Sequence, residues 1–170
     1  RRESAAVRMI SLTVEAADPL FTDQTGEAYG RIRCEGHYES WPLESRAFRR
    51  WLAGRFFAET GKAAGSDQMR SALGVLAHRA AAAGPRVALQ NRVAWGEDGA
   101  LWYDLSDADW RAIRLTADGW GPVTDPPLTF RRFEHQLPQV PPERGVPPGA
   151  LWEITRLINV REDDQLLFLT

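Results

Sequence analysis

The stretch from Leu20 to Phe57, LFTDQTGEAYGRIRCEGHYESWPLESRAFRRWLAGRFF, decides the fold that we expect for this chain of 170 residues. Two short runs, 20–22 and 27–33, read as strands on either side of the sequence DQTG, in which Gly26 is available for the positive φ of a tight turn. Residues 37–41 continue as a third short strand. The first half of the stretch therefore predicts an antiparallel sheet built from hairpins.

The second half of the stretch predicts a helix over residues 46–60. Ser45 suits the N-cap because its hydroxyl can accept a hydrogen bond from a first-turn N–H, and Gly61 suits the C-cap. The apolar residues of this helix form one stripe, which consists of Phe48, Trp51, Leu52 and Phe56. Three arginines lie on the opposite side, namely Arg46, Arg49 and Arg50.

The rest of the chain keeps helical and strand patterns in separate blocks. Further helices are expected over 3–17 and 67–83, the second capped by Ser66. The expected later strands are 86–95, 100–105, 111–115 and 120–124, with one helical turn over 106–109 between the second and the third. Separate blocks indicate an α+β fold, in which antiparallel β hairpins or a meander pack with a helix pair.

The expected domain organisation has three parts. An α+β core domain covers residues 1–124, a proline-rich linker covers 125–149, and a C-terminal helical segment covers 150–170. The final LLFLT is very apolar for a terminus. We therefore expect the natural chain to continue beyond it.

The net charge, the cysteine content and the apolar runs of the chain limit the classes of function that we expect, but they do not identify one. The net charge of −2 and the charged fraction of 26% give no global electrostatic argument for binding a nucleic acid or a membrane, so such an argument needs a local patch. The single cysteine, Cys34, excludes an internal disulfide and favours a reducing compartment. No signal peptide and no apolar run near the roughly 20 residues of a spanning helix is visible. We expect a cytoplasmic protein without a membrane partner.

Familiar catalytic and cofactor motifs are missing from the sequence. It contains no G-x-x-x-x-G-K-[ST] or G-x-G-x-x-G phosphate loop and no G-x-S-x-G nucleophile elbow. Its histidines are far apart in sequence, and no H-E-x-x-H pair exists. We accordingly expect no cofactor and identify no catalytic residue.

The densest acidic group supports one enzymatic alternative. Asp104, Asp107 and Asp109 are oxygen ligands at a spacing that can hold a hard divalent cation such as calcium, although helix capping also explains two of them. With His37 or His78 as base, such a cation would activate water. This alternative is a small metal-dependent hydrolase that acts on esters or lactones.

The strongest candidate for binding is a basic patch. Arg31 and Arg33 alternate with an isoleucine and so share one face of the sheet, while the three arginines of the helix follow closely in sequence. Arg31, Arg33, Arg46, Arg49 and Arg50 could contact phosphates, with Tyr38 or Trp41 available for base stacking. The opposing interpretation is an ordinary solvated face that neighbouring glutamates balance.

Two segments, LFTDQTGEAYGRI and WPLESRAFRRWLAGRFFAETGKAA, resemble the region that precedes the ATPase in phage- and plasmid-type replication proteins of the primase–helicase kind. The later ALWYDLSDADWRAI and DPPLTFRR are similar to the continuation of that region, so the resemblance covers about residues 18–170. It implies an accessory or linker domain beside a downstream ATPase module. It carries over no catalytic residue, and this chain ends before any phosphate loop.

The leading hypothesis is therefore a non-catalytic accessory domain of a mobile-element DNA replication protein. It would make weak contact with the DNA backbone through the five arginines. A third alternative is a protein-interaction module, which could form a homodimer through its apolar C-terminal segment.

Overall fold

The computed structural model describes residues 4–34, 36–145, 149–150 and 153. The chain divides into two compact units, residues 1–139 and 140–170, and the described α-helices and β-strands all belong to the first. Helices and antiparallel strands occupy separate stretches of the chain. The expected α+β class is confirmed.

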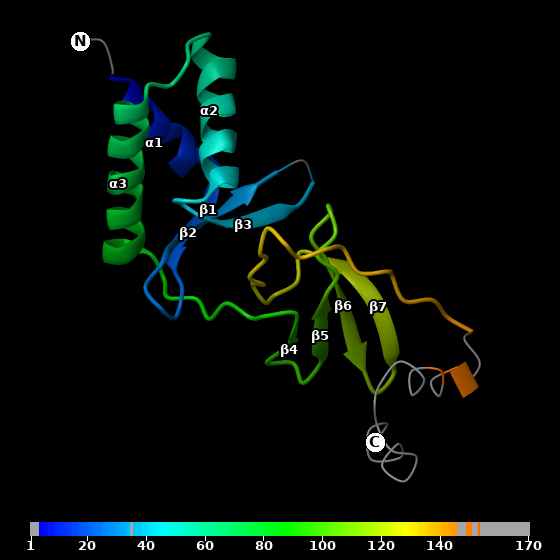
Figure 1. Cartoon of the computed structure of the whole chain (residues 1–170). Coiled ribbons are helices and arrows are strands. Elements are labelled where there is room, and N and C mark those ends of the chain that lie inside the picture. Colours follow the sequence, from blue (N-terminus) through cyan, green and yellow to red (C-terminus); the bar gives the residue numbers. More distant parts are fainter. Residues whose placement is uncertain (1–3, 35, 146–148, 151–152, 154–170) are drawn as a thin grey trace. The chain divides into compact units, whose positions relative to one another are not determined.

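The described residues of the first unit form three helices and two open antiparallel sheets (Figure 1). The helices are α1 (Ala5–Ala16), α2 (Arg46–Thr60) and α3 (Ser66–Ala83). The three-stranded sheet has the order β1 (Ala17–Thr22), β2 (Ala28–Arg33), β3 (Tyr38–Pro42). The four-stranded meander has the order β4 (Val93–Trp95), β5 (Leu101–Asp104), β6 (Arg111–Thr116), β7 (Gly119–Thr124).

The two faces of the three-stranded sheet differ. Ile32, in the central strand β2, is fully buried and belongs to the core that the helices form. Trp41 of β3 packs on the same side. Because side chains alternate along a strand, Arg31 and Arg33 lie on the opposite side, away from the helices. The sheet therefore separates these two arginines from the helical layer.

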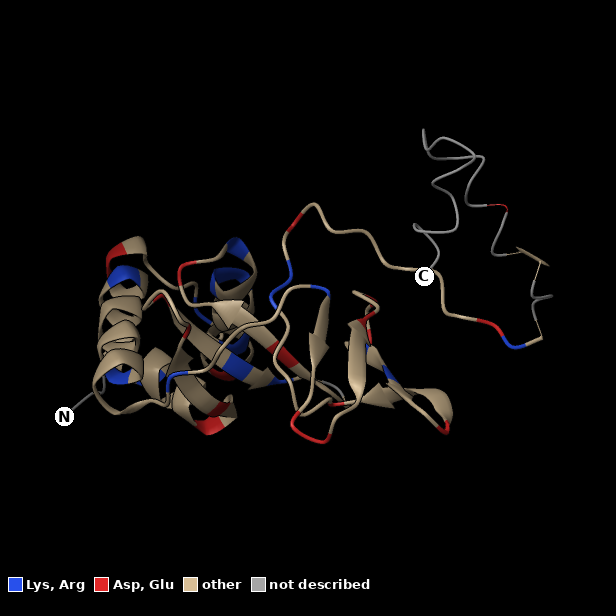
Figure 2. Cartoon of the chain, turned by 90° about the horizontal axis from the view of Figure 1, so that it is seen from below, with Lys and Arg blue, Asp and Glu red and all other residues tan. Residues whose placement is uncertain are grey.

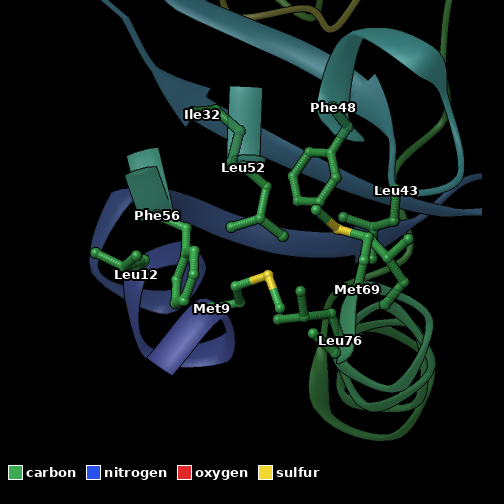
Figure 3. Packing of buried hydrophobic residues seen from close by; sticks show 11 residues of the cluster. Met9, Leu12, Ile32, Leu43, Phe48, Leu52, Phe56, Met69 and Leu76 are labelled. Carbon is green, nitrogen blue, oxygen red and sulfur yellow. The ribbon is translucent and has the colours of Figure 1, made fainter. Parts of the chain in front are cut away.

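The main hydrophobic core fills the space between the helices and this sheet (Figure 3). Its buried members are Met9, Leu12, Ile32, Leu43, Phe48, Leu52, Phe56, Met69, Ala72, Leu73 and Leu76. Burying one such leucine or phenylalanine stabilises the fold by about 1.5–3 kcal/mol. The core therefore fixes which face of α2 points inward and which face remains for solvent.

The ends of α2 are those that the sequence predicts. The Ser45 Oγ accepts a hydrogen bond from the Phe48 N–H at 3.1 Å, and Gly61 ends the helix in the left-handed conformation at φ 65°. Gly61 also donates its N–H to the carbonyl of Phe57 at 2.8 Å. The local signals thus fix the start and the end of α2.

Three predicted details are wrong. Ser66 is the first residue of α3 and not its cap, because the Gly65 carbonyl already accepts the first helical hydrogen bond, from Met69 N–H at 2.9 Å. Only Val93–Trp95 of the predicted strand 86–95 is a β-strand. Residues 106–109 form no helical turn: the Asp107 carbonyl accepts the Trp110 N–H at 3.3 Å and closes a single tight turn, and the Asp107 carboxylate accepts the Arg111 N–H at 2.9 Å.

The stretch that the sequence predicts as a linker begins within the first unit. Phe130 is buried beside Trp102, and Gln139 donates its N–H to the Leu105 carbonyl at 2.7 Å. The predicted C-terminal helices lie outside the described residues, apart from Ala150 and Glu153. Among the described residues, no helix combines the length and the apolar character needed to cross a bilayer.

Candidate nucleic-acid interface

The structure divides the five predicted arginines into two groups. Arg31 and Arg33 lie on the side of the three-stranded sheet that faces away from the helices. Arg46, Arg49 and Arg50 lie on α2, which packs on the other side of that sheet. The five side chains therefore do not form one continuous patch.

Arg31 is engaged within the protein. Its guanidinium forms an ion pair with Asp125 and lies over the ring of Tyr38, with 4.0 Å between Cζ and the ring centroid. The ion pair neutralises the charge, and the stacking occupies one face of the tyrosine. Arg31 is therefore not free to contact a phosphate, and Tyr38 is not free to stack on a base on that face, in the way that the sequence analysis predicts.

Arg49 is engaged in a similar way. Its guanidinium pairs with the Glu44 carboxylate, and its Nε donates to the Glu44 carbonyl at 3.3 Å. Both side chains are largely exposed, so the pair contributes little to stability, about 0–1 kcal/mol. It nevertheless cancels the charge that a phosphate would otherwise meet.

The remaining three arginines keep their charges free. Across residues 4–34, 36–145, 149–150 and 153, Arg33, Arg46 and Arg50 are exposed and form no hydrogen bond or ion pair. Figure 2, which colours lysine and arginine blue, shows basic residues on the turns of α2. Arg46 and Arg50 are one helical turn apart and point away from the core.

Phe57 is a residue that the sequence analysis missed. Its side chain is 59% exposed. Arg46, Arg50 and Phe57 occupy positions i, i+4 and i+11, which places them within roughly 40° of one another around the helix axis. We call these three residues the outer face of α2. The helical period alone could have revealed this stripe, because it lies opposite the buried Phe48.

Trp41 does not provide the stacking surface that the sequence suggests. Its ring packs against Trp51 at a centroid distance of 6.4 Å and joins the core on the helical side of the sheet. Arg55, which the sequence analysis also passed over, is exposed on α2 and has no partner in the described part of the chain. It lies away from the outer face, on the flank next to Trp51.

The three aspartates predicted as metal ligands form ion pairs with arginines in this structure. Asp104 is 1% exposed and receives two hydrogen bonds from Arg132, at 2.5 and 3.2 Å. Asp107 accepts from Arg111 Nε at 2.7 Å, and hydrogen bonding to Asp107 raises the pKa of Arg111. Asp109 is 3.8 Å from the same guanidinium.

No group of three or more potential metal ligands occurs among the described residues. His37, one of the two suggested bases, lies 3.1 Å from Glu39 on the three-stranded sheet, and His78 is exposed on α3. Neither belongs to the meander that carries the acidic group. The metal-dependent hydrolase therefore stays a prediction for which the geometry adds no support.

The described part of the first unit contains a small cleft and a wider groove. A cleft of about 30 Å³ lies beside Arg31, Trp110 and Asp125, which is room for roughly one or two water molecules. A wider groove of about 510 Å³ is lined mainly by apolar residues of α1, β1 and the end of α3, with Arg79 as its charged residue. The smaller cleft is also lined by Ser40 and by Asp104, whose carboxylate is paired with Arg132, whereas no histidine, cysteine or carboxylate of the described residues lines the groove.

No protein-family model, no curated protein and no solved structure matches this chain.

Proposed function

We propose that this chain is a non-catalytic accessory domain of a mobile-element DNA replication protein and that it makes weak contact with the DNA backbone. The observation that carries the proposal is the outer face of α2, where Arg46 and Arg50 have no acidic partner among the described residues. The contact surface is narrower than the five-arginine patch, since Arg31 and Arg49 are held in ion pairs.

The local charge of α2 supports this role. The helix carries four arginines and one glutamate, a net charge of +3, in a chain whose net charge is −2. Its one acid, Glu59, accepts a hydrogen bond from Arg8 of α1 at 2.6 Å and is thus already engaged. Because the Debye length is about 8–10 Å at physiological ionic strength, a phosphate close to α2 responds mainly to these nearby charges.

The expected binding is weak and depends on salt. Two or three unpaired arginines can neutralise two or three phosphates, so the logarithm of the affinity should fall against the logarithm of salt with a slope of about −2. The resemblance to the region before an ATPase suggests that a neighbouring module supplies the rest of the affinity. Such a domain would help to position DNA, but it would not bind DNA tightly by itself.

The test compares a double arginine variant with a single-arginine control. Fluorescence anisotropy at low and moderate salt measures the affinity of the whole chain for labelled single- and double-stranded DNA. Removing one phosphate contact reduces the salt slope by about 1, so Arg46→Ala with Arg50→Ala should leave little salt dependence. Arg49→Ala is the matched control, because it removes a neighbouring arginine whose charge Glu44 already cancels. Undetectable binding to both DNA forms at low salt would refute the proposal.

A further inference from the structure

The exposed ring on α2 is unusual among the aromatic residues of the described chain. The other two large exposed rings are Trp95 and Phe133, at 71% and 41% exposure. Phe133 is engaged, since Arg131 lies 5.2 Å above its ring and His135 stacks against it at 5.6 Å. Phe57 has no aromatic or cationic contact within the described residues, and it shares its helix face with two unpaired arginines.

The surroundings of Phe57 keep the face of its ring open. A helical side chain leans toward the N-terminus and covers the residues three and four positions earlier, which here are Gly54 and Ala53. A Cβ added at Gly54 would meet no atom within 4 Å, so packing does not require a glycine there. Glycine inside a helix is destabilising, and its presence leaves free space beside the ring.

We propose that the outer face of α2 binds single-stranded DNA in preference to double-stranded DNA, with one base stacked on Phe57 and neighbouring phosphates at Arg46 and Arg50. This inference rests on the proposed function and adds the form of the nucleic acid. In a duplex the faces of the bases are already stacked on one another. A ring on a convex helix surface can reach a base face only where the strand is unpaired.

The expected effect follows from the contribution of one stacked base. Alanine substitution at such platforms weakens binding by a factor of about 5 to 100, and a single ring on an open helix belongs at the lower end of that range. Phe57→Ala should therefore weaken single-strand binding about 5- to 10-fold. It should leave duplex binding unchanged, because arginine contacts alone carry that interaction. Phe57→Trp should preserve the single-strand affinity, while Phe57→Leu should behave like alanine.

The experiment uses three labelled probes of equal length: a mixed-sequence single strand, the corresponding duplex, and an abasic single strand. Trp95→Ala is the matched control, since it removes a more exposed aromatic ring from β4, outside the outer face of α2. Circular dichroism and thermal unfolding confirm that each variant is folded. We expect the wild-type chain to favour the normal single strand over the other two probes, with Trp95→Ala unchanged.

The outcomes separate this inference from the proposed function. If all three probes bind equally and only Arg46→Ala and Arg50→Ala weaken them, the stacking inference is overturned and backbone contact remains. If Phe57→Ala leaves single-strand affinity intact, the inference is likewise overturned. If no probe binds at low salt, the proposed function itself fails, and the inference fails with it.

Discussion

The four-stranded meander and helix α2 use arginine in opposite ways. Every arginine from residue 92, just before β4, to residue 132, after β7, donates to a carboxylate, a hydroxyl or a backbone carbonyl; these are Arg92, Arg111, Arg114, Arg131 and Arg132. On α2, only Arg49 has such a partner among the described residues. The meander places aspartates in its turns, whereas α2 has one acid, Glu59, which Arg8 already engages.

The contrast shows that the number of arginines is a poor guide to function. In this region the guanidinium groups hold turns and segments in place, and carboxylates pair with four of the five, namely Arg111, Arg114, Arg131 and Arg132. On α2 the charges remain available to an outside anion. If this distinction is right, substitutions in the two regions should affect different measurements, stability in the first and binding in the second.

The largest expected effect is that of Arg132→Ala. Arg132 is the partner of the buried Asp104 carboxylate and also stacks on Trp110, with 4.1 Å between Cζ and the ring centroid. Removing one partner leaves a buried charge without compensation, which typically costs about 3–5 kcal/mol. Urea denaturation of the variant should therefore show a loss of this size in the free energy of unfolding.

A double variant controls for the loss of packing. Asp104→Asn combined with Arg132→Ala removes the buried charge together with its partner, and should recover part of the lost stability. The Asp104 carboxylate also accepts the N–H and hydroxyl of Ser106, at 3.2 and 2.9 Å. A loss below about 1 kcal/mol in the single variant would mean that these two hydrogen bonds suffice, and that Arg132 does not stabilise the turn.

The parts of this fold that sequence can predict are those with local signals. The limits of α2 follow from Ser45 and Gly61, because a cap acts within one helical turn. The buried stripe of α3 has the period of a helix and consists of Met69, Ala72, Leu73, Leu76 and Ala80. Such patterns depend on near neighbours in the chain.

The candidate site depended on distant partners, and sequence could not assign them. Arg31 is neutralised by Asp125, which is 94 positions away, and Asp104 by Arg132, which is 28 positions away. Many acids could in principle pair with each arginine, so sequence alone could not say which charges remain free. For the same reason, sequence alone could not show that Asp104, Asp107 and Asp109 lie beside arginines, and the cation site stays a prediction.

A smaller effect, with a definite pH dependence, is expected for Arg114→Ala. Arg114 donates two hydrogen bonds to one oxygen of Asp98, at 2.9 and 2.7 Å. The hydrogen bond from Arg114, followed by that from the Ala100 backbone, holds the pKa of Asp98 below its ordinary value of 3.8. A lowered folded-state pKa contributes stability above the ordinary value, and that stability is lost as the pH falls through the folded-state pKa.

The stability difference between the wild-type chain and Arg114→Ala should therefore be constant near neutral pH and should shrink below pH 3.8. Denaturant unfolding at a series of pH values measures it. Arg70→Ala is a suitable control, because the Arg70–Asp67 pair is very exposed and its contact distance is 3.4 Å. A difference that persists unchanged through the acid range would show that Arg114 acts by packing on Trp102, whose ring lies 6.0 Å away, and not through Asp98.

The smallest expected effect on stability is that of Arg50→Ala, and it tests the other half of the comparison. Arg50 has no partner within the described chain, so its removal should change the free energy of unfolding by no more than about 0.5 kcal/mol. Arg49→Ala, at the adjacent position, should cost at most about 1 kcal/mol through its exposed pair with Glu44. In DNA affinity the order should reverse, because only Arg50 offers an uncancelled charge. A loss above about 1 kcal/mol for Arg50→Ala would mean that this residue stabilises the fold as the meander arginines do, and the contrast between the two regions would disappear.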